Sequence, residues 1–478
     1  MKHAIVRPRP FAFTAAVAVA LVGAASSLHA TIVQNGLQAW FSADATSTVN
    51  GGSIANGGSV SAWANQGALG SAINVSASGS AQPIYVQNGI DRGGGVYQPV
   101  IRFNRDLGNT TTTVGSPNRM VTSGNTDLGI VNDSTWFIVF NPLVSNAQQG
   151  LFGLNSSANR FGAFYTGSTN QLRYMNFTDP DTVIQPTIPT AGVNISDSRR
   201  SGGGSVAMSG RLNGNTFANS DQTTSLNATT PVSTQFRIGN QLDGVPNNFV
   251  GDIAEVIVYN RALNDAERII VENRLSAKYG TTLAANDLYA GKTTGNGNYD
   301  LDLIGIGDKT VTGTALNPGS VTTSEDGGGL KLAALNNSLN SDGEFLLAGR
   351  ASDAANSWTA VTVGGINYAR WSRDWYLDKT TADSLDAKFT FDFSLAPGAS
   401  QPTSGSYALL YKSSLGGSWT DLGLAATVAG QQVSFNVLNA NLSDGYYTLG
   451  MIPEPSTIFL LLCGGGLVWA WFRRGRRW

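Results

Sequence analysis

The side chains of this chain that could do chemistry are almost all carboxylates and other oxygen ligands. Both histidines, His3 and His29, and the single cysteine, Cys463, lie close to the ends of the sequence. The body between residues 31 and 452 therefore lacks the side chains for a Ser-His-Asp or Cys-His nucleophile, a histidine-ligated zinc site or histidine acid–base catalysis. What remains is hard-cation binding or carboxylate catalysis.

Carboxylate catalysis would need two acids at a set separation, as in glycoside hydrolases. The body has five glutamates, and they do not form a Glu-x-Asp-x-x-Glu strand. These glutamates are Glu255, Glu267, Glu272, Glu325 and Glu344. Asp300 and Asp302 would share one face of a strand, and we expect a solvated strand edge rather than a catalytic pair. The sequence thus predicts a protein that is not an enzyme and has no catalytic residue.

One of these glutamates has a structural explanation in a predicted helix. Residues 251–263 read as a strand that ends in a polar turn, and Asn264 with Glu267 forms a capping box. Helical spacing continues to Tyr279, and Gly280 supplies the C-terminal stop. We expect one strand, one helix and then a new region.

Short strands separated by Gly, Asn, Ser and Thr turns precede this helix. They are expected at 37–42, 99–103, 134–140, 150–154, 161–165, 171–177, 204–212 and 234–238. Many antiparallel strands without intervening helices predict a β-sandwich.

A second strand-rich region follows, with 286–299 as the junction. Its strands are expected at 301–307, 329–335, 344–349, 369–377, 387–393, 407–412, 432–437 and 446–451. Within 369–377, Trp371 and Trp375 should share the core face, and Arg370 and Arg373 should point the other way. The predicted fold class is all-β, a sandwich followed by a second β-sandwich-like domain.

Tryptophans could also stack on sugars if they are exposed, but most aromatics of a sandwich without disulfides belong to the core. No tryptophan stands out by sequence alone, so the ligand-binding residues stay unknown at this level.

The two ends of the chain indicate export. Lys2, Arg7 and Arg9 precede an apolar segment over 11–25, and Ala30 offers a small residue for cleavage, which is the pattern of a signal peptide. At the other end an apolar run over 458–472 is followed by four arginines, which stay on the cytoplasmic side by the positive-inside rule. These are Arg473, Arg474, Arg476 and Arg477. We expect a C-terminal transmembrane helix in the inner membrane, with the body outside.

The charge of the body follows once the ends are removed. Seven of the 30 basic residues and one of the 32 acidic residues lie in the ends, which leaves 23 basic and 31 acidic side chains and a net charge of −8. An acidic body argues against nucleic acid as a partner.

The C-terminus resembles the PEP-CTERM sorting signal of Gram-negative bacteria. Pro453, Glu454 and Pro455 match its motif, and the apolar segment and basic tail follow in order. The resemblance implies recognition by an exosortase-type enzyme, removal of the tail, and attachment or release at the cell surface or in the extracellular matrix.

A second resemblance concerns the first strand-rich region. Residues 36–44, 63–66, 136–140 and 251–263 with the following helix resemble a laminin-G-like, concanavalin A-like jelly roll over about 31–280. The expected domains are then a signal peptide (1–30), this jelly roll (31–280), a second β-rich domain (281–452) and the sorting signal (453–478).

Calcium is the one cofactor that these residues suggest. Asp44, Asp252 and Glu255 lie in the segments most similar to the family, whose members sometimes bind calcium, and a jelly roll commonly makes its first and last strands neighbours. The simpler interpretation, which we favour, is that Asp252 and Glu255 flank a turn of the sheet.

The expected function is that of an exported surface or matrix protein in adhesion or in binding exopolysaccharide or other carbohydrate. The alternatives are a carbohydrate-active hydrolase on surface polysaccharide and a purely structural matrix component. Fold alone decides none of these.

Overall fold

A computed structural model places most of the body of the chain. It describes residues 32–452 apart from 45, 78–81, 94, 104–118, 132, 144–147, 156–159, 167–170, 177–178, 186–191, 202–205, 218–221, 225–232, 241–247, 311–317, 352–356, 381–383 and 397–405. The predicted signal peptide and the predicted sorting signal, with its arginines and membrane segment, lie outside the described residues. Within the described ranges, no helix is both long and apolar enough to cross a membrane.

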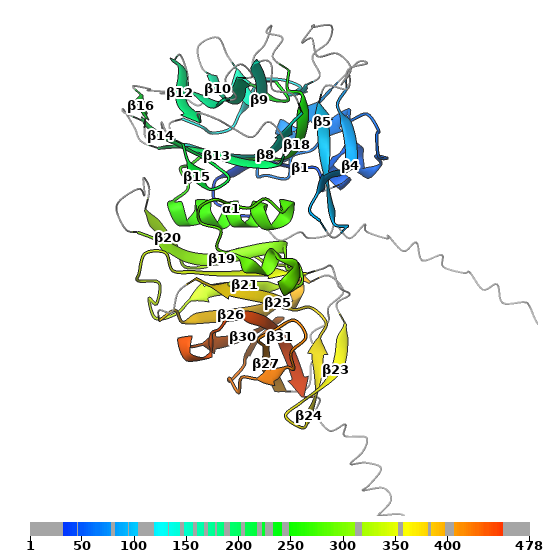
Figure 1. Cartoon of the computed structure of the whole chain (residues 1–478), viewed down its shortest axis with the longest axis vertical. Coiled ribbons are helices and arrows are strands. Elements are labelled where there is room, and N and C mark those ends of the chain that lie inside the picture. Colours follow the sequence, from blue (N-terminus) through cyan, green and yellow to red (C-terminus); the bar gives the residue numbers. More distant parts are fainter. Residues whose placement is uncertain are drawn as a thin grey trace, which may run out of the picture.

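Two β-sandwiches lie on opposite sides of one helix, α1 (Asp265–Tyr279). The body is therefore layered as sheet, sheet, helix, sheet, sheet (Figure 1). In each sandwich we call the sheet next to α1 the inner sheet and the other the outer sheet. The prediction of an all-β fold is confirmed.

The first sandwich is antiparallel throughout the described strands. Its inner sheet has the order β15 (Asn215–Thr216), β14 (Val206–Leu212), β13 (Asn194–Ser201), β8 (Ser134–Pro142), β18 (Gly251–Tyr259), β5 (Tyr97–Phe103) and β4 (Ile84–Asp91), with β1 (Leu37–Ser42) on β18 and β16 (Gln222–Thr224) on β14. Its outer sheet has the order β12 (Asp179–Gln185), β11 (Gln171–Asn176), β10 (Arg160–Thr166), β9 (Gln148–Asn155), β17 (Ser233–Ile238), β6 (Met120–Thr122), β3 (Val75–Ser76) and β2 (Ala62–Trp63), with β7 (Thr126–Asp127) on β17.

The second sandwich is built in the same way from fewer strands. Its inner sheet has the order β20 (Gly319–Val321), β19 (Leu301–Lys309), β22 (Phe345–Arg350), β25 (Trp375–Lys379), β31 (Gly445–Ile452), β24 (Ile366–Trp371) and β23 (Trp358–Val363), with β27 (Ser406–Lys412) on β31 and β28 (Thr420–Asp421) on β27. Its outer sheet has the order β21 (Leu330–Ala334), β26 (Ala387–Asp392), β30 (Gln432–Val437) and β29 (Thr427–Ala429). Short 3-10 helices fill the connections at Thr46–Thr48, Asn50–Gly52, Gly70–Ile73, Ala290–Lys292, Thr294–Asn296, Phe393–Leu395 and Asn439–Asn441.

Aromatic side chains from both sheets fill each sandwich core. In the first, Trp136 stacks on Phe152 with ring centroids 5.1 Å apart, and in the second Trp371 and Trp375 pack at 5.4 Å. Each such pair contributes about 1 kcal/mol beyond area burial.

The predicted single strand over 369–377 is wrong in one respect. β24 ends at Trp371 and β25 begins at Trp375, and their registers on β31 differ by two residues. The Thr448 hydroxyl lies 3.1 Å and 2.7 Å from the carbonyls of Trp371 and Arg373 at this break. Both tryptophans are core residues as predicted, but Arg373 is buried and donates to the Gly328 carbonyl. The prediction for Arg373 is wrong because residues 371, 373 and 375 lie on the same face of an alternating strand.

Helix α1 forms where the capping box predicts it. The Asn264 side chain accepts from the Glu267 backbone, Glu267 accepts in return from the Asn264 backbone, and Gly280 takes the left-handed conformation with φ 69°. Two apolar faces of α1 are covered. Val271, Leu275 and Tyr279 pack on the first inner sheet, and Ala266, Ile269, Ile270 and Ala277 pack on the second. The helix therefore belongs to both sandwiches and joins them.

Candidate functional site

The buried carboxylate of Glu255 is the centre of a polar cluster at the C-terminal end of α1. Glu255 lies on β18, where the neighbour of that strand changes from β5 to β1. Its carboxylate accepts from the Trp40 indole, the Tyr279 hydroxyl and the Lys278 ammonium, each at 2.6 Å. Charge-assisted hydrogen bonds of this kind are about twice as strong as neutral ones. The Glu255 cluster therefore fastens β1, β18 and α1 together.

Asp44 approaches the same lysine from the end of β1. Its Oδ2 atom is 3.1 Å from Lys278 Nζ, and its side chain is 24% exposed, compared with 1% for Glu255. Burial works to lower the pKa of Lys278, but Asp44 and Glu255 outweigh it and raise this pKa above its ordinary value.

Asp252, the third predicted calcium ligand, is held elsewhere. Its carboxylate pairs with Arg102 of β5 in a bidentate arrangement at 2.6 Å and 2.9 Å. The structure thus brings together two of the three predicted residues, Asp44 and Glu255, with the Lys278 ammonium bound to both. The part of the chain that the structure describes holds no group of three His, Cys, Asp or Glu side chains arranged for a metal ion. Calcium at these residues stays a prediction.

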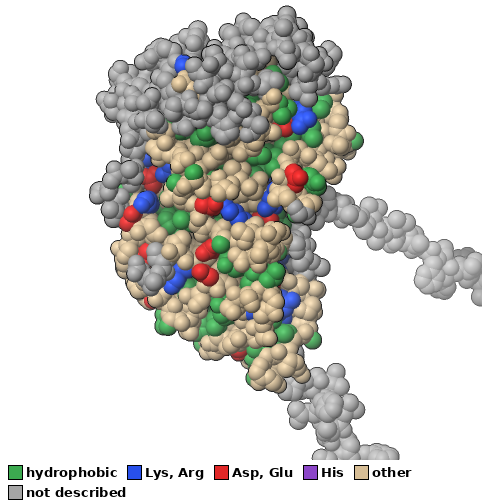
Figure 2. Space-filling model, viewed as in Figure 1, with side chains coloured by type: hydrophobic (Ala, Val, Ile, Leu, Met, Phe, Trp, Pro, Cys, Tyr) green, Lys and Arg blue, Asp and Glu red, His purple; other side chains and the backbone are tan. Residues whose placement is uncertain are grey.

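A small pocket lined by several charged residues opens beside this cluster, between the two sandwiches. Its volume is about 40 Å³, enough for a few water molecules. Its lining consists of Trp40, Asp44, Gln66, Arg274, Lys278, Asp300, Leu301 and Asp302. Figure 2 shows acidic and basic side chains side by side along the band where the sandwiches meet.

Asp300 and Asp302 are not on a solvated strand edge, so that prediction is wrong. Both are buried, and each has its own arginine: Asp300 pairs with Arg92 at 2.7 Å, and Asp302 pairs with Arg350. Arg92 also donates to the Ala277 carbonyl at 2.7 Å, near the end of α1. Through Arg92, Asp300 connects the second sandwich with the first sandwich and the helix, whereas Asp302 pairs with β22 within the second sandwich.

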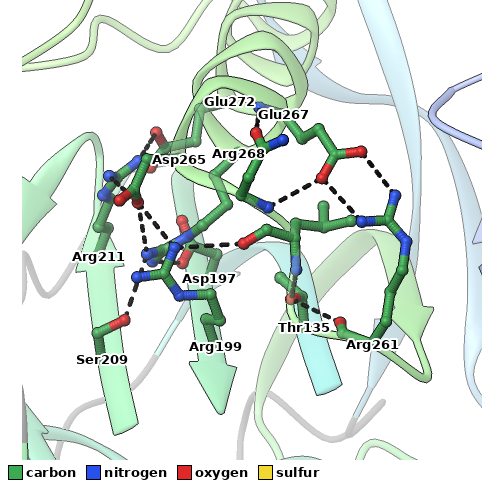
Figure 3. Close-up of polar contacts among 12 residues, drawn as sticks. Thr135, Asp197, Arg199, Ser209, Arg211, Arg261, Asp265, Glu267, Arg268 and Glu272 are labelled. Carbon is green, nitrogen blue, oxygen red and sulfur yellow. Dashed lines mark hydrogen bonds and ion pairs between the residues drawn. The ribbon is translucent and has the colours of Figure 1, made fainter. Parts of the chain in front are cut away.

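A second polar cluster lies at the N-terminal half of α1 (Figure 3). Three arginines and three carboxylates, all at least 89% buried, alternate between the helix and the strands β13 and β14. They are Asp197, Arg199, Arg211, Asp265, Arg268 and Glu272. Asp265 accepts from Arg199 at 2.8 Å and Arg211 at 3.1 Å, and Arg268 pairs with Asp197. We call this set the α1 ion network.

Burial strongly shifts the pKa values of two residues of the α1 ion network, Glu272 and Arg199. Burial raises the pKa of Glu272 to about 8, with Asp197 adding to the rise and Arg211, 2.9 Å away, opposing it. Burial also lowers the pKa of Arg199 to about 9.

The three remaining glutamates of the body also make structural contacts. Glu267 receives the capping bond and pairs with Arg261 at 2.6 Å. Glu325 accepts from the Gln34 backbone at 3.0 Å. Glu344 accepts from two backbone N–H groups at 2.8 Å and 2.9 Å. All five glutamates of the body therefore hold segments of the chain in place.

A different arrangement surrounds Trp419 on the second sandwich. This half-buried indole lies directly before β28, with Lys412 Nζ 4.8 Å and Arg370 Cζ 5.3 Å from its ring centroid. Asp374 is 3.9 Å from Arg370 and accepts from the Tyr299 hydroxyl at 2.9 Å. We call Arg370, Asp374, Lys412 and Trp419 the Trp419 patch. The patch combines an aromatic ring with cationic donors and a carboxylate acceptor. No sequence pattern indicated it, because its residues are spread over 49 positions between Arg370 and Trp419.

The comparisons with known proteins give only distant likenesses. No protein-family model and no curated protein matches the sequence. Among solved structures, Trypanosoma rangeli sialidase in complex with 2,3-difluoro-KDN is 18% identical over 48% of this chain and 31% of that chain, with a TM-score of 0.34. Domain 4 of the arabinanase AbnA from Geobacillus stearothermophilus, in complex with arabinotriose, is 13% identical over 49% of this chain and 97% of that chain, with a TM-score of 0.33. The sialyllactose-bound CBM40 of a Ruminococcus gnavus sialidase is 18% identical over 32% and 97%, with a TM-score of 0.26. The chain thus spans about a third of the length of the sialidase.

Proposed function

We propose that this protein is exported, held in the inner membrane by its C-terminus, processed by an exosortase-type enzyme and displayed on the surface or in the matrix of a Gram-negative bacterium. There it binds polysaccharide without catalysis. The terminal sequence motifs support the route. All five glutamates make structural contacts, which supports the proposal that the protein does not hydrolyse polysaccharide, because a hydrolase needs a carboxylate pair that is available to the substrate.

The observation that carries polysaccharide binding is the Trp419 patch. A flat apolar ring can stack on the C–H face of a sugar, and neighbouring charged groups can bind its hydroxyl or carboxylate groups. Arg370 and Lys412 are donors that lie over the ring, and Asp374 is an acceptor next to Arg370. The patch therefore has the three kinds of group that a sugar needs.

Trp419→Ala is expected to weaken binding of the polysaccharide that residues 31–452 select on a glycan array. Loss of one aromatic contact of about 1.4 kcal/mol corresponds to a roughly tenfold higher Kd. Titration calorimetry of wild type and variant measures the change. Tyr97→Ala is the matched control, because Tyr97 is 44% exposed but lies on the first sandwich.

Equal weakening by both variants, or by neither, would contradict a site at the Trp419 patch. Release of reducing ends from the bound polysaccharide would instead favour the hydrolase. If the protein neither binds a polysaccharide on the array nor releases reducing ends, the result would favour a purely structural matrix component.

The sorting motif gives a separate prediction about location. Replacing Pro453, Glu454 and Pro455 by alanine should leave the full-length protein uncleaved in the membrane fraction, because the processing enzyme loses its recognition residues. Immunoblots of membrane and extracellular fractions measure this. The same replacement at Ser456 and Thr457 serves as control, and normal processing of the triple variant would end the proposal.

A further inference from the structure

The strand β23 forms an edge of the second inner sheet. Among the described strands it pairs only with β24, in an unbroken register from Trp358↔Trp371 to Val363↔Ile366. The hairpin of these two strands projects at the side of the second sandwich in Figure 1. Thr359, Ala360 and Thr362 are exposed.

The hydrogen-bond alternation of the hairpin shows which backbone groups point outward. Ser372 donates its backbone N–H to the Ser357 carbonyl at 2.8 Å. Because bonding direction alternates along an antiparallel strand, the N–H and C=O groups of Trp358, Ala360 and Thr362 point away from β24. β23 thus presents a row of three residues whose outward backbone groups have no partner strand among the described residues.

This edge lacks the features that usually prevent pairing of sheet edges. No charged residue occurs between Asp353 and Arg370, and β23 has no proline and no bulge. Three other edges are blunted: β20 and β29 have three residues each, and β4 carries a register break between Val86 and Ile90. An uncharged, regular, exposed edge is a template for strand addition.

We propose that β23 is a self-association edge, through which two copies of this chain pair antiparallel and join their second inner sheets. The twofold axis passes through Ala360, so that Ala360 faces its symmetry mate and Trp358 faces Thr362 of the other copy. In this register each of the three residues whose backbone N–H and C=O groups point outward pairs with an equivalent residue of the other copy. Alanine, the smallest of the three side chains, lies at the twofold axis.

A second copy is the partner that the geometry of the edge favours, because its three outward residues can pair with the same three residues of another copy about Ala360. Copies of a body with net charge −8 repel each other over most of their surface. The stretch between Asp353 and Arg370 carries no charge, so two copies can approach there without that cost. This inference does not depend on polysaccharide binding.

Sedimentation velocity of residues 31–452, which contain all four sheets and both cores, tests the proposal over a range of concentrations. Wild type should show a monomer–dimer equilibrium. Ala360→Pro should raise the dimer Kd at least tenfold without unfolding the hairpin, because the lost N–H points outward and edge strands tolerate such a proline. Thr362→Lys should act similarly by placing a charge on the edge.

Val428→Lys is the matched control, since Val428 is 52% exposed on β29, the edge of the outer sheet in the same sandwich. It should dimerise like wild type. Hydrogen exchange should show the Ala360 and Thr362 amides slowed at high concentration in wild type and in Val428→Lys, and the Thr362→Lys variant should lack this slowing. A wild type that stays monomeric, or variants at Ala360 and Thr362 that dimerise unchanged, would overturn the proposal.

Discussion

Glu255→Ala is expected to lower the free energy of unfolding by about 3–5 kcal/mol, the usual result of removing one member of a buried charge pair. The substitution removes the acceptor of three hydrogen bonds, from Trp40, Lys278 and Tyr279, at a position that is 1% exposed. Each donor would stay buried without this acceptor, which is more costly than the average value of a hydrogen bond. Urea unfolding of residues 31–452, followed by tryptophan fluorescence, measures the change.

Asp44→Asn is the control for this experiment. Asp44 contacts the same ammonium, but its side chain is 24% exposed and Lys278 keeps Glu255 as its partner. The expected loss is below about 1 kcal/mol, as for other ion pairs near solvent. Equal losses for the two variants would show that the cluster is not centred on Glu255.

The sequence predicted those structural features that depend on residues close together in the chain, such as helix ends and the positions of strands. The helix start depends on Asn264 and Glu267, three residues apart, and its end depends on one glycine, so the sequence located α1 without knowledge of the fold. The strand predicted at 37–42 agrees with β1, and most others agree within two residues, because alternation is a local signal. β13 was missed, since its sequence Asn-Ile-Ser-Asp-Ser-Arg-Arg-Ser looks like a polar turn.

The polar clusters could not be predicted, because their members are distant in sequence. Glu255 and Trp40 are 215 residues apart and meet only because β1 pairs with β18. Asp300 and Asp302 look like solvated residues by alternation alone, and they are buried because Arg92 comes from the other sandwich and Arg350 from β22. Sequence patterns report the period of a strand and not what covers it.

The charged residues of α1 illustrate the same limit on a larger scale. A helix with Asp265, Arg268, Glu272 and Arg274 would be expected to expose a charged face to water. Here Asp265, Arg268 and Glu272 are buried against β13 and β14 of the first inner sheet and pair with charged residues of those strands, whereas Arg274 donates to the Leu303 carbonyl of the second sandwich. The charged side chains of α1 are therefore explained by the strands that pack on the helix, which the helix sequence alone does not reveal.

Stability is expected to fall between pH 5 and 8 because of Glu272. Its pKa is raised from 4.5 to about 8 in the folded protein, mainly by burial. Over this window the folded state binds a proton that the unfolded chain has lost, so ionisation with rising pH costs more in the folded state and stability decreases. One pKa unit corresponds to about 1.4 kcal/mol, which we take as the minimum loss.

Glu272→Gln should remove this part of the pH dependence, because the amide resembles the protonated acid and does not titrate. Arg211 keeps Asp265 as a partner at 3.1 Å, so the α1 ion network stays paired in the variant. Asp326 and Asp378, whose pKa values burial raises to about 6, contribute equally to both proteins and cancel in the difference. The variant should equal wild type near pH 5 and exceed it near pH 8 in urea unfolding. Parallel curves would mean that Glu272 is ionised throughout, and that its pair with Arg211 outweighs burial.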